Sequence, residues 1–240
     1  MALYFDQQAW REALKQPDWY LLVGREYQRF SKQARQNPDQ ARAIKEEVRS
    51  FLEERLRLGE VALATAGPNL DAERQPIDTV VIHHTSGSSG LSLERLNVIH
   101  LLNLYLPHFA NPHGVEREEI KGQPIWSNHL RDGRQVFWAY HWLVRMNGTA
   151  ERLLEDDQIG WQAGNWEVNC RSVAICLDND YTDSVPTSSV IRALAQLVRR
   201  DYPHIEPKRV FGHREINPKT MCPGNKFLAG WKAQLIGELA

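Results

Sequence analysis

The segment Thr79-Val80-Val81-Ile82-His83-His84 decides the fold class of this 240-residue chain. Threonine, valine and isoleucine favour extended backbone, and a short apolar run with few breaks is typical of a strand that is buried in a sheet. The segment therefore predicts an inner β-strand at residues 79–84. Such strands occur mainly in α/β proteins, whose sheets are covered by helices.

The rest of the C-terminal two thirds alternates between extended and helical patterns and contains no internal repeat. Ser92 is predicted to cap a helix that ends near Pro107, and Asn147-Gly148 is a hairpin signal. Further strands are expected at 135–146, 151–154, 171–177 and 208–212, and further helices at 187–202 and 226–239. Residues 107–133 are rich in Pro, Gly, Asn and His, which predicts a long irregular insertion.

Residues 1 to about 60 read as three helices. Asp6 is positioned to cap the first, the second begins at Trp19, and Asn37-Pro38 marks the start of the third, which Gly59 ends. A polar stretch with two prolines follows at 67–76. We therefore expect a helical N-terminal region at 1–66, a linker at 67–76 and an α/β domain at 77–240. This region has few residues suited to chemistry, so we interpret its helices as a structural cap or a docking element.

Charge and apolar patterning exclude several functions. Lys and Arg total 29 and Asp and Glu total 30, so the chain has no electrostatic footprint for nucleic acid or an anionic membrane. No apolar block is long enough for a Sec signal or a membrane helix. Three cysteines argue against a disulfide scaffold. If Cys170 and Cys176 bracket one strand, they lie about 20 Å apart, too far to form a bond.

Three short segments place metal-ligating side chains beside predicted strands: Val81–Thr85, Phe211–Glu215 and Met221–Gly224. Zinc binds imidazole and thiolate, and a catalytic zinc site keeps three protein ligands and one open position. Each segment alone is weak evidence, because a single strand histidine or buried cysteine is more often a core residue. Together they favour a zinc site built from two histidines and one cysteine.

In this context the chain resembles the zinc-dependent N-acetylmuramoyl-L-alanine amidases, a family that includes phage lysozyme-type amidases and peptidoglycan recognition proteins. The resemblance covers about residues 77–235. It rests on VVIHHTSG, AYHWLVRMNGT, NCRSVAICL and GHREINPKTMCPG, of which the last is the most specific. It implies a central mixed β-sheet flanked by helices, with zinc as cofactor and His83, His213 and Cys222 as its ligands.

The resemblance also implies an activity: zinc-assisted hydrolysis of the amide between the lactyl group of muramic acid and L-Ala of the stem peptide. Tyr140 and Thr220 occupy the places of residues that assist catalysis by hydrogen-bonding the attacking water or the developing oxyanion. Tyr140 also has a plainer interpretation as an aromatic residue packed on the sheet. A non-catalytic protein that binds peptidoglycan or muropeptides is the alternative function.

Several residues depart from the pattern that the resemblance implies. The muropeptide-recycling branch has Asp as third ligand and a catalytic Glu where this chain has Cys176, so Cys222 favours the lytic or recognition branches. Gln162 stands where many relatives have His. His84 should face away from His83 and serve in packing or hydrogen bonding. The insertion at 107–133 adds three histidines that we interpret as solvated loop residues: His108, His113 and His129.

Peptidoglycan or a muropeptide is the expected partner, with no nucleic acid and no membrane insertion. A protein partner that docks on the N-terminal helices is a further possibility that the sequence leaves open. Without an export signal, the chain is expected to be made in the cytoplasm and to reach cell wall by lysis or a non-Sec route, or to act on fragments inside the cell.

Overall fold

The chain forms two structural units, described here in a computed structural model that covers residues 4–33, 37–110 and 123–239. One unit comprises Met1–Asn69 and Ser92–Phe137, and the other comprises Leu70–Leu91 and Trp138–Ala240. Each unit is therefore assembled from two separate stretches of the chain. The predicted boundaries at residues 66 and 77 stay a prediction.

The first unit is mainly helical, and three of its helices begin directly after the capping residues that the sequence predicts. Side-chain oxygens of Asp6, Asn37 and Ser92 accept backbone hydrogen bonds at the starts of α1, α3 and α4. The elements of this unit are α1 (Gln7–Leu14), α2 (Trp19–Gln33), α3 (Pro38–Arg57), α4 (Leu93–His100), the π-helix η3 (Leu101–Tyr105), α5 (Leu106–Ala110) and the short strands β2 (Leu130–Arg131) and β3 (Arg134–Gln135).

Buried tryptophans hold the N-terminal helices of this unit together. The indole N–H of Trp10 donates to Glu26 over 2.6 Å, and that of Trp19 donates to the carbonyl of Ala62 over 2.8 Å. Phe5 and Phe51 pack against Trp10 at ring-centroid distances of 4.2 and 6.1 Å. The apolar faces of these helices are thus used inside the unit, and each buried indole keeps a hydrogen-bond acceptor.

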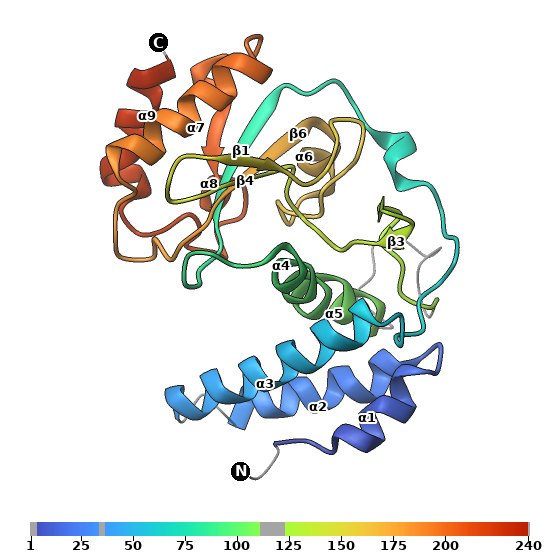
Figure 1. The fold of residues 1–240 in the computed structure, drawn as a ribbon. Helices are drawn as coiled ribbons and strands as arrows, with labels where there is room; N and C mark the ends of the chain where they lie inside the picture. Colours follow the sequence, from blue (N-terminus) through green and yellow to red (C-terminus); the bar gives the residue numbers. More distant parts are fainter. Residues whose placement is uncertain (1–3, 34–36, 111–122, 240) are drawn as a thin grey trace. The chain divides into compact units, whose positions relative to one another are not determined.

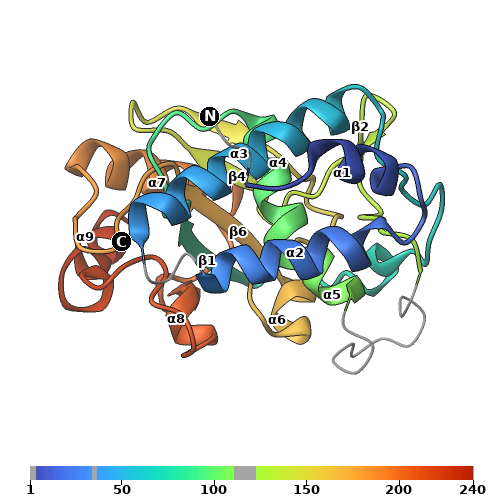
Figure 2. The same cartoon turned by 90° about the horizontal axis from the view of Figure 1, so that it is seen from below.

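A five-stranded mixed sheet with the order β5-β4-β6-β1-β7 is the centre of the second unit (Figure 1). β1 pairs in parallel with β6 on one side and β7 on the other, β4 is parallel to β6, and β5 is antiparallel to β4. Seen from below, β6 again lies beside β1 (Figure 2). The strands are β1 (Thr79–His84), β4 (Trp142–Val144), β5 (Ala150–Arg152), β6 (Ser172–Leu177) and β7 (Val210–Gly212).

The two faces of this sheet have different roles. On one face, Val80, Ile82 and Ile175 pack against α7 (Ser188–Asp201), the π-helix η6 (Phe227–Trp231) and α9 (Lys232–Leu239). On the other, Val81 packs against residues of α6 (Trp166–Arg171) and α8 (His213–Ile216). Two 3-10 turns complete the unit: η2 (Leu70–Glu73) and η5 (Pro207–Arg209). Helices thus flank the central mixed sheet, as predicted.

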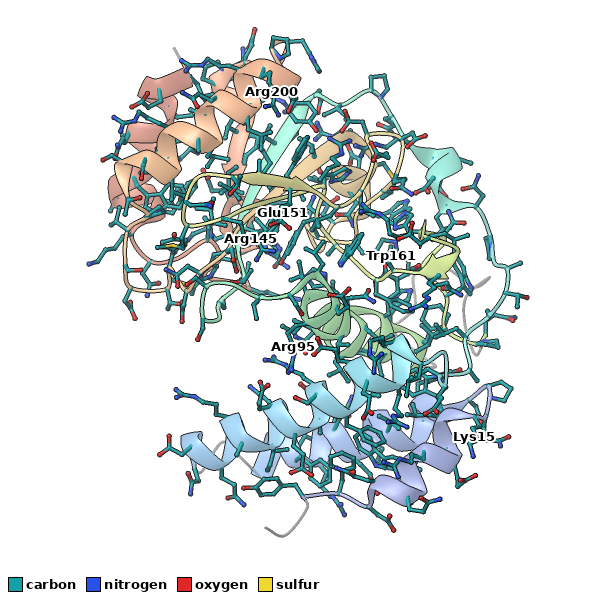
Figure 3. The ribbon with its side chains drawn as sticks, viewed as in Figure 1. Lys15, Arg95, Arg145, Glu151, Trp161 and Arg200 are labelled. Carbon is teal, nitrogen blue, oxygen red and sulfur yellow. The ribbon has the colours of Figure 1, made fainter. Side chains whose placement is uncertain are left out.

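Ion pairs join the hairpin formed by β4 and β5 to the end of β6. Arg145 lies 2.6 Å from Glu151 and 2.7 Å from Asp178, whose side chain is buried. Figure 3 shows Arg145 and Glu151 side by side in this hairpin. The same Asp178 accepts the backbone N–H of Gly90 over 2.8 Å, and Arg145 donates to the carbonyl of Leu91. The loop that follows β1 is therefore fixed at its far end.

Four predicted features were wrong in detail. The strand predicted at 135–146 is interrupted: residues 136–139 are buried, but Phe137 donates its backbone N–H to the Asn97 side chain and not to a neighbouring strand. The closing helix begins with a π-helical turn. Residues 107–110 lie in α5 and not in an irregular segment. Cys170 lies in α6, so it does not bracket a strand with Cys176, and none of the three cysteines forms a disulfide.

No helix in the described ranges has both the length and the apolar character that crossing a bilayer requires. This agrees with the absence of an apolar block in the sequence.

Replacement of Ile175 by alanine tests the packing of the sheet. Ile175 is fully buried in β6 against the α7 and α9 face, so we expect Ile175→Ala to lower the free energy of unfolding of this unit by about 2–4 kcal/mol. Urea denaturation followed by circular dichroism measures the change. Val185→Ala is the matched control, because Val185 is 47% exposed and should change stability by less than about 0.5 kcal/mol. Equal effects of the two substitutions would contradict the assigned core.

Candidate metal centre

β1 positions the first candidate ligand. Strand side chains alternate between faces, so Val80 and Ile82 point into the α7 face, and His83 points to the opposite face with Val81. His83 is 1% exposed. Its neighbour His84 accepts the backbone N–H of Tyr181 over 2.9 Å at Nδ1 and lies 2.8 Å from the Ser86 hydroxyl at Nε2. The adjacent histidines therefore have separate surroundings.

The second candidate ligand follows β7, which pairs with β1. Gly212 is in register with Ile82, so the next residue, His213, lies beside His83, with ring centroids 4.6 Å apart. His213 is the first residue of α8, where Glu215 accepts the backbone N–H of Gly212 over 2.8 Å and pairs with Lys232 over 2.6 Å. The Arg-Glu pair of the GHRE motif thus contributes a carboxylate that shapes the turn carrying His213.

The loop after α8 brings back Cys222, the third candidate ligand. The backbone N–H of Arg214 donates to the carbonyl of Cys222 over 2.7 Å, which ties the two ends of the loop together. The Thr220 hydroxyl accepts the backbone N–H of Cys222 over 3.1 Å. Backbone hydrogen bonds from Gly224 to Met221 and from Asn225 to Thr182 hold the following residues. The position of the thiol is therefore set by the backbone of a short, internally bonded loop.

The three side chains converge on one point. One ligand atom from each of His83, His213 and Cys222 lies within 4.8 Å of the others. Cys222 Sγ lies 3.6 Å from His83 Nδ1. This equals the edge of a tetrahedron with zinc–sulfur and zinc–nitrogen bonds of about 2.3 and 2.0–2.1 Å, which is about 3.6 Å. The spacing fits a divalent cation.

The hydrogen bonding of His213 also fits a metal ligand. Nε2 of His213 is buried and has no hydrogen-bond partner among the residues that the structure describes. The ring is held from its other side by the backbone of Ala163. A buried nitrogen without a partner costs free energy unless something binds it, and a metal ion at this position would do so.

Burial governs the protonation of the candidate ligands. It lowers the pKa of His213, so the ring is neutral at physiological pH and its nitrogen is available as a ligand. It raises the pKa of the Cys222 thiol to about 12, although a hydrogen bond from the backbone of His84 acts in the opposite direction. The thiol therefore holds its proton until a cation replaces it, and binding releases that proton.

The two residues predicted to assist catalysis lie beside the cluster. The Tyr140 ring is 4.9 Å from the His83 ring, and its side chain hydrogen-bonds that of Cys176. Burial, with the nearby Cys176 and Cys222 sulfurs, raises the pKa of Tyr140 well above its usual value, so the phenol stays protonated. Thr220 is two residues from Cys222, and its oxygen is already an acceptor, which leaves the O–H as a donor.

These positions place the site at the carboxyl ends of parallel strands, and a family match covers them. A model of the N-acetylmuramoyl-L-alanine amidase family, Amidase_2, matches residues 73–225. The matched range is more than half of the chain and contains all three candidate ligands. The chain belongs to this amidase family.

Individual members and solved structures are distant from the chain. The 1,6-anhydro-N-acetylmuramyl-L-alanine amidase AmpD of Haemophilus influenzae is 24% identical over 141 residues, 55% of this chain and 77% of that protein. The amidase LysC of Clostridium intestinale is 18% identical, with a TM-score of 0.48 over 74% of this chain and 94% of that chain. Drosophila PGRP-LB is 20% identical, with a TM-score of 0.43 over 70% and 85%.

The structure adds contacts around the candidate metal centre that the sequence did not reveal. Gln162, singled out only as a departure from histidine, is 5% exposed and touches His83. Cys176, noted as a departure from glutamate, is in register with His83 and contacts Tyr140. Alternation along β6 makes Cys176 and Ile175 point to opposite faces of the sheet, just as alternation along β1 separates His83 from Ile82. This signal was available in the sequence.

The histidines of the predicted insertion do not share one environment. His129 is 1% exposed, so its interpretation as a solvated loop residue was wrong. It follows Ser127 in a tight turn, where the Ser127 hydroxyl accepts the His129 backbone N–H over 3.1 Å. His108 is half-buried in α5, and His113 lies outside the described residues. His129 is therefore buried inside the mainly helical unit and is not exposed on a loop.

Gly224 tests whether the loop backbone sets the position of Cys222. Gly224 has a φ of 122°, and an added Cβ would lie 1.9 Å from the carbonyl oxygen of Tyr181. We expect Gly224→Ala to displace the loop and to weaken metal binding by at least about tenfold, in line with a strain of about 1–3 kcal/mol. Metal titration of the purified protein measures this. Gly237→Ala in α9, where an added Cβ meets nothing within 4 Å, should leave affinity unchanged. Unchanged affinity in Gly224→Ala would contradict the argument.

Proposed function

We propose that the protein is a zinc-dependent N-acetylmuramoyl-L-alanine amidase. It would hydrolyse the amide between the lactyl group of muramic acid and L-Ala of the stem peptide. The observation that carries the proposal is the convergence of His83, His213 and Cys222 within 4.8 Å in a chain that belongs to this family. A protein that only binds its ligand has no need of this donor set, which matches a catalytic zinc site in number and type.

His83, His213 and Cys222 are the proposed zinc ligands, and three ligands leave one coordination position open. When bound, the ion supplies Lewis acidity that polarises a carbonyl group and lowers the pKa of water. Two neutral imidazoles and one thiolate leave a net charge of about +1 on the centre. The protein buries His83 and half-buries His213 and Cys222, which strengthens their interaction with a cation by limiting the access of water.

Tyr140 and Thr220 are the proposed hydrogen-bond donors to the reacting group. The Tyr140 phenol keeps its proton because burial raises its pKa, so it can donate to an oxygen that gains negative charge. The Thr220 hydroxyl oxygen accepts the Cys222 backbone N–H, so the hydroxyl proton of Thr220 points away from that contact and can be donated elsewhere. Each such donor is worth about 2–4 kcal/mol of transition-state stabilisation when it is well placed.

The products of this reaction would be a muramic acid residue with a free lactyl carboxylate and a stem peptide with a free amino terminus at L-Ala. Two sources of substrate share this linkage: polymeric cell wall and released muropeptides. The Haemophilus influenzae relative carries the name of an amidase for 1,6-anhydro-N-acetylmuramyl-L-alanine. Both an intact peptidoglycan and a 1,6-anhydro-muropeptide therefore belong among the substrates to be tested.

Substitution of His213 tests the proposal. We expect the zinc-loaded protein to release free stem peptide from both substrates, and His213→Ala to reduce the rate at least about 10³-fold, because one of three ligands is lost. Mass spectrometry of the released peptides and metal analysis of the protein measure the two effects. His204→Ala is the matched control: His204 is exposed, and its Nε2 hydrogen-bonds the carbonyl of Ile77 over 2.8 Å.

The same experiment distinguishes an amidase from the alternative, a non-catalytic recognition protein. A metal-loaded protein that binds muropeptide tightly but releases no peptide would replace the amidase proposal with a recognition protein. Peptide release that survives complete removal of metal by a chelator would contradict the zinc mechanism.

Substitution of Tyr140 tests the proposed donor. Tyr140→Phe removes the proposed donor hydroxyl but keeps the ring, whose centroid lies 4.9 Å from that of His83, so we expect kcat to fall about 10²–10³-fold while zinc content stays unchanged. Steady-state kinetics with metal analysis of the same preparation provide both readouts. Tyr27→Phe removes a buried hydroxyl from α2 and should leave kcat unchanged. A rate for Tyr140→Phe within a factor of two of wild type would leave Tyr140 with a packing role.

The remaining expectations about partners and location stay predictions. The N-terminal helices bury Trp10 and Trp19 within their own unit, so these two side chains are not available to a protein partner. Synthesis in the cytoplasm, with access to cell wall by lysis or a non-Sec route, likewise stays a prediction.

A further inference from the structure

Gln162 makes a contact with His83 that the proposed reaction does not use. Its Oε1 lies 2.6 Å from His83 Nε2, and its Nε2 donates to the Ser172 hydroxyl over 2.9 Å. All three side chains are buried, at 5%, 1% and 0% exposure for Gln162, His83 and Ser172. A buried chain of hydrogen bonds thus runs from the first residue of β6 through Gln162 to the candidate ligand on β1.

This chain of hydrogen bonds selects the tautomer of His83. Because the Gln162 amide nitrogen donates to Ser172, the amide oxygen faces His83 and accepts a hydrogen bond from Nε2–H. Nδ1 is then unprotonated, and it is the nitrogen that lies 3.6 Å from Cys222 Sγ. Without an acceptor at Nε2, the ring could place its proton on Nδ1, where it would block the ligand position.

Gln162 is itself held in place by its backbone. The backbone N–H of Gln162 and that of Ala163 both donate to the Asn169 side chain in α6, over 3.2 and 2.8 Å. The carbonyl of Ser172 accepts from Arg74 over 2.9 Å, which holds the other end of the chain. Both neighbours of the amide are therefore anchored to secondary structure, and the amide keeps one position relative to His83.

We infer that Gln162 is a positioning residue for the metal centre: it holds His83 in the tautomer and ring orientation that present Nδ1 to a cation. The inference rests on the proposed function, since it takes His83 as a metal ligand. Partners of this kind fix ligand orientation and raise ligand basicity, and their loss typically weakens metal affinity by about 10–100-fold.

Metal titration of full-length variants tests the inference without relying on activity. Metal-free wild type, Gln162→Leu and Gln162→Glu are titrated with Co²⁺, whose thiolate charge-transfer absorption reports the bond to Cys222, and with Zn²⁺ in competition with a chromophoric chelator. We expect Gln162→Leu to bind both ions about 10–100-fold more weakly. Gln162→Glu keeps an acceptor oxygen for Nε2–H and should restore affinity to near the wild-type value.

Gln158→Leu is the matched control, because it removes an amide from the same unit. The Gln158 side chain accepts the backbone N–H of Glu155 over 2.8 Å and should leave metal affinity unchanged. Thermal unfolding followed by circular dichroism checks that each variant is folded. If Gln162→Leu does not fold, Ser172→Ala takes its place. This substitution keeps Gln162 but leaves its amide free to rotate, so we expect the variant to bind both Co²⁺ and Zn²⁺ more weakly than wild type.

Each outcome decides between distinct conclusions. Affinity of Gln162→Leu equal to wild type, or equal losses in the Leu and Glu variants, overturns the positioning role and leaves Gln162 as a packing residue. Where Ser172→Ala is the test, metal affinity equal to that of wild type overturns the positioning role of Gln162. A wild-type protein that binds neither ion overturns the proposed function and this inference together, whereas tight binding by wild type with unchanged binding by the variants overturns the inference alone.

Discussion

The parallel hydrogen-bonded pairing of β1 with β6 and β7 is the constraint on which the site depends. It places Ile82 beside Gly212 and His83 beside Cys176, so the residue after β7 emerges next to His83. The register is held from the opposite face, where Val80, Ile82 and Ile175 are buried against α7 and α9. A slip of one residue would turn His83 into that apolar core and bring Ile82 to the site. Packing on one face of the sheet thus determines which side chains lie at the candidate metal centre on the other face.

Burial disfavours the charged forms of His213 and Cys222, so both side chains are neutral before a cation binds. The neutral His213 ring and the protonated Cys222 thiol both follow from removal of water. A divalent ion would compensate both costs, because it would bind His213 Nε2, which has no hydrogen-bond partner within the described ranges, and would replace the thiol proton. The same desolvation keeps the Tyr140 phenol protonated as a donor. One physical cause, the exclusion of water, therefore accounts for the protonation of His213, Cys222 and Tyr140.

Much of the fold and of the site was predictable from local sequence. The inner strand at 79–84, the caps Asp6, Asn37 and Ser92, and the amphipathic helix α7 all carry short-range signals, and the structure confirms them. Two of the failures share a cause: an asparagine side chain accepts a backbone hydrogen bond that the sequence analysis did not anticipate. Residues 136–139 are as apolar as a strand, but an asparagine side chain takes the backbone hydrogen bond of Phe137. Cys170 looked like a strand end because the Asn165 cap that starts α6 was not recognised.

The sequence by itself determined which residue types are present for chemistry: two histidines and a cysteine, within motifs typical of one family. One proline lies in the loop between His213 and Cys222, and another follows Cys222 directly. Residue type and local spacing are encoded along the chain, so reading them needs no coordinates. Only the tertiary structure decided which ring nitrogen of His83 faces the thiol, that Gln162 holds the other, and that His129 is buried. These contacts join residues that are far apart in sequence, and their geometry exists only once the strands have paired and water has been excluded.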